Sequence, residues 1–203
     1  NKARTGITIF VAVFGIFVLL FSAGCGQKAA KETTEKIIEK SVADKGQSAE
    51  VNIDPDSKSF SMTVKDEDGQ QKTMQLNANE ESASMVVTEE DGNMTMTTGA
   101  AAHLPEGFPK DVPMHASMKL STSLSDGASG FTLQCTSDKS IGELVGYYQE
   151  TCAKSGWTEE MNLSQNPAAP MHILVFHKND LALNLIFQAQ DGEVHVTVGV
   201  GKK

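Results

Sequence analysis

Hydrophobic and polar residues change their spacing several times along this chain of 203 residues. Residues 7–21 form an apolar stretch, whereas residues 27–47 are rich in Ala, Lys, Glu and Thr. Ile37, Ile38 and Val42 are the sizeable apolar residues of the second segment, and their spacing predicts a short amphipathic helix within 31–43. Because such a helix is too short and polar to be stable alone, we expect a tether that packs weakly on the next part of the chain.

From Ala49 onward, apolar and polar residues alternate with the period of a β-strand that buries one face. Asp-Gly pairs at 68–69 and 91–92 lie between these runs and favour tight hairpin turns. Residues 48–99 are therefore predicted to form an antiparallel β meander. Its alternating apolar residues are Val51, Ile53, Phe60, Met62, Val64, Met74, Leu76, Met94 and Met96.

The last hundred residues have a mixed pattern. A proline-rich segment at 104–113 is expected to be extended and to lie across a sheet or over the edge of a core. A helix is predicted from Ser140, which forms a capping box with Glu143, to Gly156. Strand patterns occur at 118–124, 130–135, 171–177, 181–188 and 194–200. Residues 104–203 are therefore predicted to be a small domain of order β-β-α-β-β-β, with one helix on an antiparallel sheet, and the fold class is α+β.

The charge of the chain limits its partners. Lys and Arg total 17 and Asp and Glu total 26, which gives a formal net charge of −9. Nucleic acid is excluded as a partner, because phosphates require a basic surface.

The N-terminal segment has the order of a secretory signal. Lys2 and Arg4 precede the apolar stretch, and small residues come after it. A retained transmembrane helix is the alternative, because no charged residue lies between Arg4 and Lys28. Both interpretations place the rest of the chain outside the cytoplasm.

Ser22-Ala23-Gly24-Cys25 resembles the lipobox of bacterial lipoproteins, with Ser22 where the family prefers an aliphatic residue. The resemblance implies that 1–24 is a signal peptide, that Cys25 carries palmitate-type acyl chains, and that 25–47 is a tether. The membrane would then be a partner, reached through the lipidated Cys25. Gly26 implies the outer membrane if the organism has two membranes.

A second resemblance covers residues 104–203. The segment Phe108-Pro109-Lys110-Asp111-Val112-Pro113, the pair Tyr147-Tyr148 and the later Gly156-Trp157 look like a domain of uncharacterised bacterial envelope lipoproteins. That family brings no established activity, so the resemblance implies a fold and a location only.

Few residues suggest chemistry. Cys135 and Cys152 are both expected to face the interior, where they would form either a disulfide or two buried free thiols. Acidic turns at 54–57 and 66–69 lack the twelfth-position Glu of a calcium loop. The five histidines are scattered, and no nucleophile elbow, zinc motif, phosphate loop or Cys-x-x-Cys pair occurs. We therefore predict no catalytic, metal or cofactor-binding residue.

These observations favour a noncatalytic, lipid-anchored envelope protein that binds a protein, a polymer or a small molecule. An enzyme of unrecognised type and a metal-responsive envelope module remain as alternatives. An exposed apolar patch on the sheet would favour binding, and a polar cluster in a deep pocket would favour an enzyme.

Overall fold

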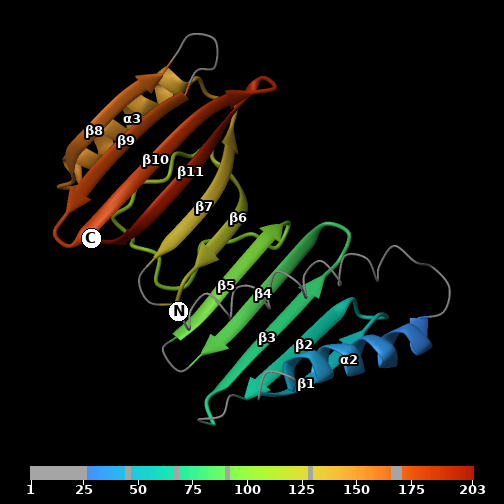
Figure 1. The fold of residues 1–203 in the computed structure, drawn as a ribbon. Helices are drawn as coiled ribbons and strands as arrows, with labels where there is room; N and C mark the ends of the chain where they lie inside the picture. Colours follow the sequence, from blue (N-terminus) through green and yellow to red (C-terminus); the bar gives the residue numbers. More distant parts are fainter. Residues whose placement is uncertain (1–26, 44–46, 66–68, 90–91, 128–129, 166–170) are drawn as a thin grey trace. The chain divides into compact units, whose positions relative to one another are not determined.

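The computed structural model describes residues 27–43, 47–65, 69–89, 92–127, 130–165 and 171–203. The predicted signal peptide and Cys25 lie outside these residues. The described part of the chain contains the helices α2 (Gln27–Ala43) and α3 (Ile141–Lys154), and neither is long and apolar enough to cross a membrane. The strands are β1 (Ser48–Asp54), β2 (Ser59–Lys65), β3 (Gln71–Ala78), β4 (Ser82–Glu89), β5 (Gly92–Gly99), β6 (Lys119–Ser125), β7 (Phe131–Ser137), β8 (Thr158–Gln165), β9 (Met171–Lys178), β10 (Leu181–Gln190) and β11 (Glu193–Lys202) (Figure 1).

The fold is mainly antiparallel sheet, with strand order β1-β2-β3-β4-β5-β6-β7-β11-β10-β9-β8. The chain forms two compact units, one comprising Asn1–Ala78 with Thr88–Glu90 and the other comprising Asn79–Val87 with Asp91–Lys203. The alternation that predicted strands in residues 48–99 is confirmed by β1 to β5. A separate domain at 104–203 stays a prediction.

In the first unit, α2 packs beside β1. The helix begins at Gln27, earlier than predicted, and it buries Ile38 and Val42. The expectation of a weakly packed tether is therefore wrong from Ile38 onward, because these two side chains complete a core. The other core residues of this unit are Val51, Ile53, Phe60, Met62, Met74 and Leu76.

Two glutamates of α2 bind the outer edge of β1, the last strand at this end of the sheet. Glu35 Oε1 accepts a hydrogen bond from the Ile53 backbone N–H at 2.8 Å, and Glu39 Oε1 accepts one from the Val51 N–H at 3.4 Å. The two carboxylates can reach alternate residues of one strand because they lie four residues apart on the same helix face. Backbone donors that could recruit another strand are thereby satisfied.

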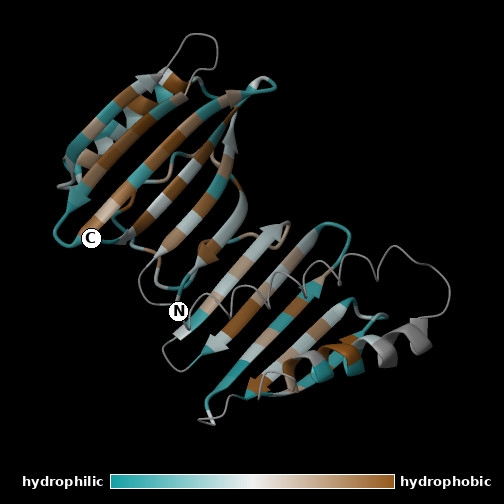
Figure 2. Ribbon diagram, viewed as in Figure 1, coloured by the Kyte–Doolittle hydropathy of each residue, from teal (hydrophilic) through white to brown (hydrophobic). Residues whose placement is uncertain are grey.

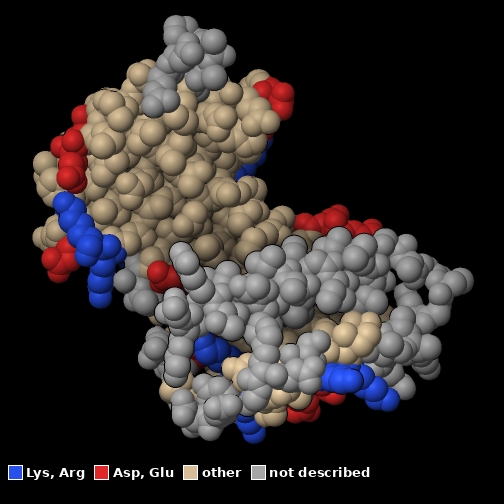
Figure 3. Space-filling model, in the orientation of Figure 1, with Lys and Arg blue, Asp and Glu red and all other residues tan. Residues whose placement is uncertain are grey.

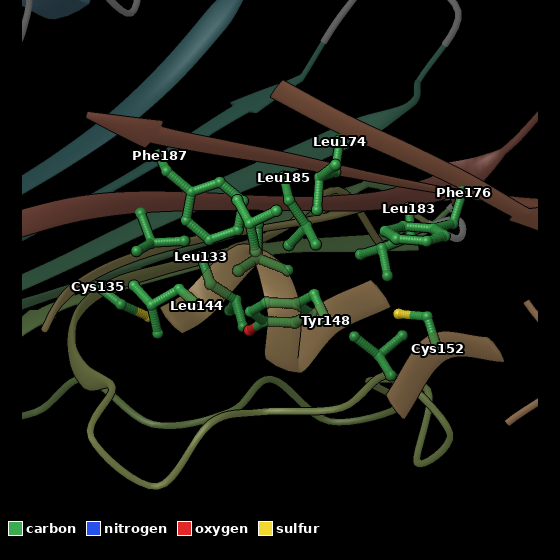
Figure 4. Packing of buried hydrophobic residues seen from close by; sticks show 14 of the residues in the cluster. Leu133, Cys135, Leu144, Tyr148, Cys152, Leu174, Phe176, Leu183, Leu185 and Phe187 are labelled. Atoms are coloured by element: carbon green, nitrogen blue, oxygen red, sulfur yellow. The ribbon is translucent and has the colours of Figure 1, made fainter. Parts of the chain in front are cut away.

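In the second unit, α3 covers one face of the sheet. The predicted capping box is confirmed: the Glu143 N–H donates to Ser140 Oγ at 3.3 Å, and the Ser140 N–H donates to Glu143 Oε2 at 3.0 Å. Gly156, at φ +80°, ends the helix as predicted. Figure 4 shows the side chains that α3 and the strands bury together. They include Leu133, Leu144, Tyr148, Leu174, Phe176, Leu183, Leu185, Phe187, Val196 and Val198.

The proline-rich segment lies over this core, as expected. Val112 is buried, and Phe108 packs edge-on against Phe131 with ring centroids 5.6 Å apart. The Trp157 indole N–H donates to the Asp111 carbonyl at 3.1 Å. The segment is thus fixed both by apolar packing and by a hydrogen bond from the first residue beyond the helix turn.

Strand β8 was not predicted. Four strands come after α3, whereas the sequence pattern had indicated three. Met161 and Leu163 are its sizeable apolar residues and both are exposed, so β8 lacks the buried alternation that marks a core strand.

Candidate functional site

The sheet of the second unit has a face that α3 does not cover, which we call the open face. Register alternation assigns residues to it, because side chains opposite one another in an antiparallel pair share a face. On β7 to β11 the open face carries Thr132, Gln134, Thr136, Thr158, Met161, Leu163, Met171, Ile173, Val175, His177, Ala182, Asn184, Ile186, Gln188, Gln190, Glu193, His195, Thr197, Gly199 and Gly201.

Glu193, at the turn end of β11, is the one Asp, Glu, Lys or Arg among these open-face residues, although 21% of the whole chain is charged. Figure 3 shows tan atoms across β8 to β11, with charged atoms toward the margins. A surface with so few charged residues on an acidic protein resembles the central part of a protein interface, where charged residues are depleted.

The apolar residues of the open face gather on three neighbouring strands. Leu163, Ile173 and Ile186 are cross-strand neighbours on β8, β9 and β10, and Met161 lies opposite Val175 on the next row. We call these five residues the apolar patch. Leu163, Met161 and Ile186 are 46%, 44% and 37% exposed.

Strand β9 is apolar on both sides. The strand is largely brown, and thus hydrophobic, in Figure 2. Within its run Ile173-Leu174-Val175-Phe176, Leu174 and Phe176 are buried on the side of α3 and the other two residues lie on the open face. Continuous apolar runs are typical of strands covered on both faces, whereas a sheet with one covered face normally alternates apolar and polar residues. The described residues provide cover on one side only.

The polar side chains of β8 explain why its apolar residues face outward. Glu159 Oε2 accepts a hydrogen bond from Gln149 of α3 at 2.8 Å, and the Asn162 side chain contacts His172 Nε2 at 2.7 Å. Glu159 and Asn162 lie opposite Phe176 and Leu174, on the helix side of the sheet. Met161 and Leu163 therefore point to the open face.

A small charged group marks one corner of the open face. An irregularity between Glu159 and Met161 leaves Glu160 as the extra residue of β8. Its carboxylate lies 3.4 Å from Lys203 Nζ and 3.5 Å from His177 Nδ1. The nearest carboxylate to the apolar patch along β8 is thus already paired with a cation.

The two cysteines of the fold are both buried and both free. In Figure 4 their sulfur atoms lie on opposite sides of the Tyr148 ring, so the possible Cys135–Cys152 disulfide is not formed. The two thiols lie in the same core but do not meet, because the Tyr148 side chain fills the space between them. Burial raises the pKa of Cys135 to about 11 and that of Cys152 to about 12. Both thiols are therefore protonated at neutral pH, and neither is a nucleophile.

The histidines stay apart, and the described residues contain no group of three or more metal-ligating side chains. His172 and His177 lie on opposite faces of β9, as their odd spacing predicted. The open face thus offers aliphatic contacts, amides and hydroxyls rather than a set of reactive groups.

One polar network was missed by sequence reasoning. His115 Nδ1 accepts the backbone N–H of Ser117 at 3.1 Å and lies 2.8 Å from its hydroxyl, which in turn lies 2.6 Å from the buried Ser137 hydroxyl. No carboxylate in the described part of the chain binds the His115 ring, so a catalytic triad is not assembled there. The network joins the residues that follow the proline-rich segment to β7, and a His-x-Ser spacing gave no specific signal for it.

Comparison with known proteins adds no relative: no family model, no curated protein and no solved structure matches this chain.

Proposed function

We propose that this chain is a noncatalytic, lipid-anchored envelope protein that binds a partner protein through the open face of its second unit. The observation that carries the proposal is the apolar patch, which lies exposed on a sheet face whose one Asp, Glu, Lys or Arg among the described strand residues from β7 to β11 is Glu193. Exposed apolar patches with polar rims are typical of interaction sites.

The energetics favour an occupied patch. Burial of the exposed parts of Met161, Leu163 and Ile186 would contribute about 2 kcal/mol each, at roughly 25 cal/mol per Å² of apolar surface. The hydroxyl of Thr197 and the amides of Asn184 and Gln188 share the open face and can hydrogen-bond a partner at the rim.

A protein fits this surface better than a polysaccharide does. The open-face residues of β7 to β11 include aliphatic side chains and no Phe, Tyr or Trp. The face therefore provides no phenyl or indole ring on which a sugar could stack, whereas aliphatic side chains pack well against another apolar protein surface.

The anchor in this proposal rests on the sequence at Cys25. Two or three acyl chains on that residue would hold the protein stably at a membrane, whereas one chain binds only marginally. Fractionation of cells that express Cys25→Ser tests this part. The variant should carry no acyl chains and should be lost from the membrane fraction. A Cys25→Ser variant with unchanged membrane attachment and an unacylated wild type would contradict it.

The binding face is tested with two substitutions that add the same charge on opposite sides of the sheet. Ile186→Glu places a carboxylate in the apolar patch, and Gly146→Glu places one on the exposed side of α3, where an added Cβ meets no atom within 4 Å. Chemical crosslinking in intact cells followed by mass spectrometry should show loss of partner crosslinks for the first variant only. Equal crosslinking by both variants and the wild type would refute the binding face.

A further inference from the structure

The two edge strands of the sheet, β1 and β8, differ in whether their outward backbone groups are hydrogen-bonded. At the β1 edge, the carboxylates of Glu35 and Glu39 accept the outward N–H groups of Ile53 and Val51. At the β8 edge, no hydrogen bond from another described segment caps the outward backbone groups, and the exposed side chains include Met161 and Leu163. An edge with apolar side chains and free backbone groups is a template for strand addition.

We propose that β8 pairs with β8 of a second copy of this chain, in antiparallel register centred on Asn162. Two sheets would thereby join into one across a two-fold axis. This inference goes beyond the proposed function: the pairing uses the edge strand, so the apolar patches of both copies adjoin on one side of the joined sheet and remain available to a partner that binds the open face.

The sequence of β8, TEEMNLSQ, is self-complementary in this register. Met161 lies opposite Leu163 of the other copy, and Leu163 lies opposite Met161, so each apolar residue gains an apolar cross-strand neighbour. Glu160 lies opposite Ser164, which keeps the carboxylates of the two copies at opposite ends of the paired stretch. A parallel arrangement would instead place Glu160 beside Glu160, and like charges directly opposite one another are destabilising.

Neutral pairing matters because the chain is acidic. Two molecules of formal net charge −9 repel one another unless their contact surface is free of unpaired carboxylate. Glu160 is already close to Lys203 and His177, Glu159 lies beyond the irregularity and is hydrogen-bonded to Gln149, and Glu193 lies on β11, three strands from the edge. A second copy can therefore pair with Met161, Asn162 and Leu163 without placing a carboxylate between them.

The irregularity beside Glu159 limits the length of the pairing. It bends the strand at that end, so the regular stretch begins at Met161 and the register centred on Asn162 relies on the residues from Met161 to Leu163. A contact this short buries less area than stable interfaces usually do, so the dimer is weak in dilute solution. Confinement of both copies to one membrane by acyl chains would raise their effective concentration and favour pairing.

Cysteine crosslinking of the full chain in intact cells tests the register. Asn162 is opposite itself in the proposed dimer, at the Cα separation of about 4.5–5.5 Å that a disulfide spans. Ser164 of one copy lies roughly 14 Å from Ser164 of the other, given about 3.4 Å per residue. Under mild oxidation, Asn162→Cys should yield at least about ten-fold more covalent dimer than Ser164→Cys, because Cα atoms more than about 7 Å apart cannot be bridged.

Three comparisons decide the outcome. Wild-type protein reports any background from Cys25, and Leu163→Glu added to Asn162→Cys should abolish the covalent dimer by placing a carboxylate in each Met161–Leu163 pair. Equal dimer from the two cysteine variants, dimer from Ser164→Cys alone, no dimer, or an adduct with a different protein would each overturn the β8 pairing. If the pairing fails while Ile186→Glu still removes partner crosslinks, the proposed function stands.

Discussion

A single buried hydroxyl makes a measurable prediction about the core beneath α3. Tyr148 is fully buried, and its ring packs against Phe187 with centroids 5.8 Å apart. Its hydroxyl has no hydrogen-bond partner among the described residues. The His115 backbone N–H interacts with it weakly, without hydrogen-bond geometry, and burial raises the pKa of Tyr148 far above its usual value. Tyr148→Phe removes this unsatisfied group and keeps the ring.

The expected change is a gain in stability. An unsatisfied buried hydroxyl costs about 1–3 kcal/mol. The space left by one oxygen, roughly 15 Å³, costs about 0.4 kcal/mol at ~24 cal/mol per Å³. The free energy of unfolding should therefore rise by about 1–2 kcal/mol, which corresponds to about 2–8 °C in Tm for a protein of this size.

Trp157 provides the assay. It is the one tryptophan of the chain and is buried in the second unit, so its fluorescence during urea unfolding reports on this core. Tyr147→Phe is the matched control, because the Tyr147 hydroxyl donates to the Met114 carbonyl at 3.4 Å. The free energy of unfolding of Tyr147→Phe should be about 0.5–1 kcal/mol lower than that of the wild type. If Tyr148→Phe is destabilised as much as the control, the claim that the Tyr148 hydroxyl lacks a hydrogen-bond partner is wrong.

Three further predictions concern other parts of the fold. Because burial raises the pKa of Cys135 to about 11 and of Cys152 to about 12, the folded state holds these protons longer, so stability is full below pH 9 and falls above it. The slope is up to about 1.4 kcal/mol per pH unit for each thiol, and Cys135→Ala should remove one thiol's share of the alkaline slope in urea titrations. Gly99→Ala should cost about 2–4 kcal/mol in thermal unfolding, because φ is +64° and the new Cβ would lie 1.9 Å from the Glu81 carbonyl oxygen; an unchanged Tm would contradict this close approach. Lys178→Met should cost about 1–2 kcal/mol, measured by Trp157 fluorescence, since Nζ donates to a carboxylate at 2.6 Å and to a carbonyl at 2.8 Å; a neutral effect would show that these bonds are exchanged for water at no cost.

Local signals in the sequence predicted most elements correctly. The capping box of Ser140 and Glu143 and the positive-φ Gly156 act within a few residues, so they specify α3 without knowledge of its neighbours. Alternating apolar residues identified β1, β2, β3 and β5 for the same reason. Weak local patterns failed: α2 is stabilised by burial against β1, and propensity alone could not indicate its packing.

The candidate site can be recognised only when the strand order and register are known. Met161 and Leu163 gave no core signal because they face away from α3, and β8 was missed for that reason. Only the register shows that they share a face with Ile173, Val175 and Ile186. The apolar run of β9 was visible in the sequence, but a run alone does not tell whether both faces are covered.

The cysteines show a similar limit. The periodicity placed Cys135 and Cys152 in one interior correctly, and both are buried. A disulfide needs Cα atoms within about 7 Å, which depends on where along the core each residue lies. The ring of Tyr148, on the helix turn before Cys152, occupies that position instead.

Site-specific photocrosslinking tests the central claim most directly, namely that the open face of the second unit is the binding surface. A photoreactive residue would replace Ile186 on the open face or Glu150 on the exposed side of α3, in the full chain in intact cells. The account predicts protein crosslinks from position 186 and few or none from position 150. Crosslinks from position 150 alone would place the binding surface on the helix side and contradict the account.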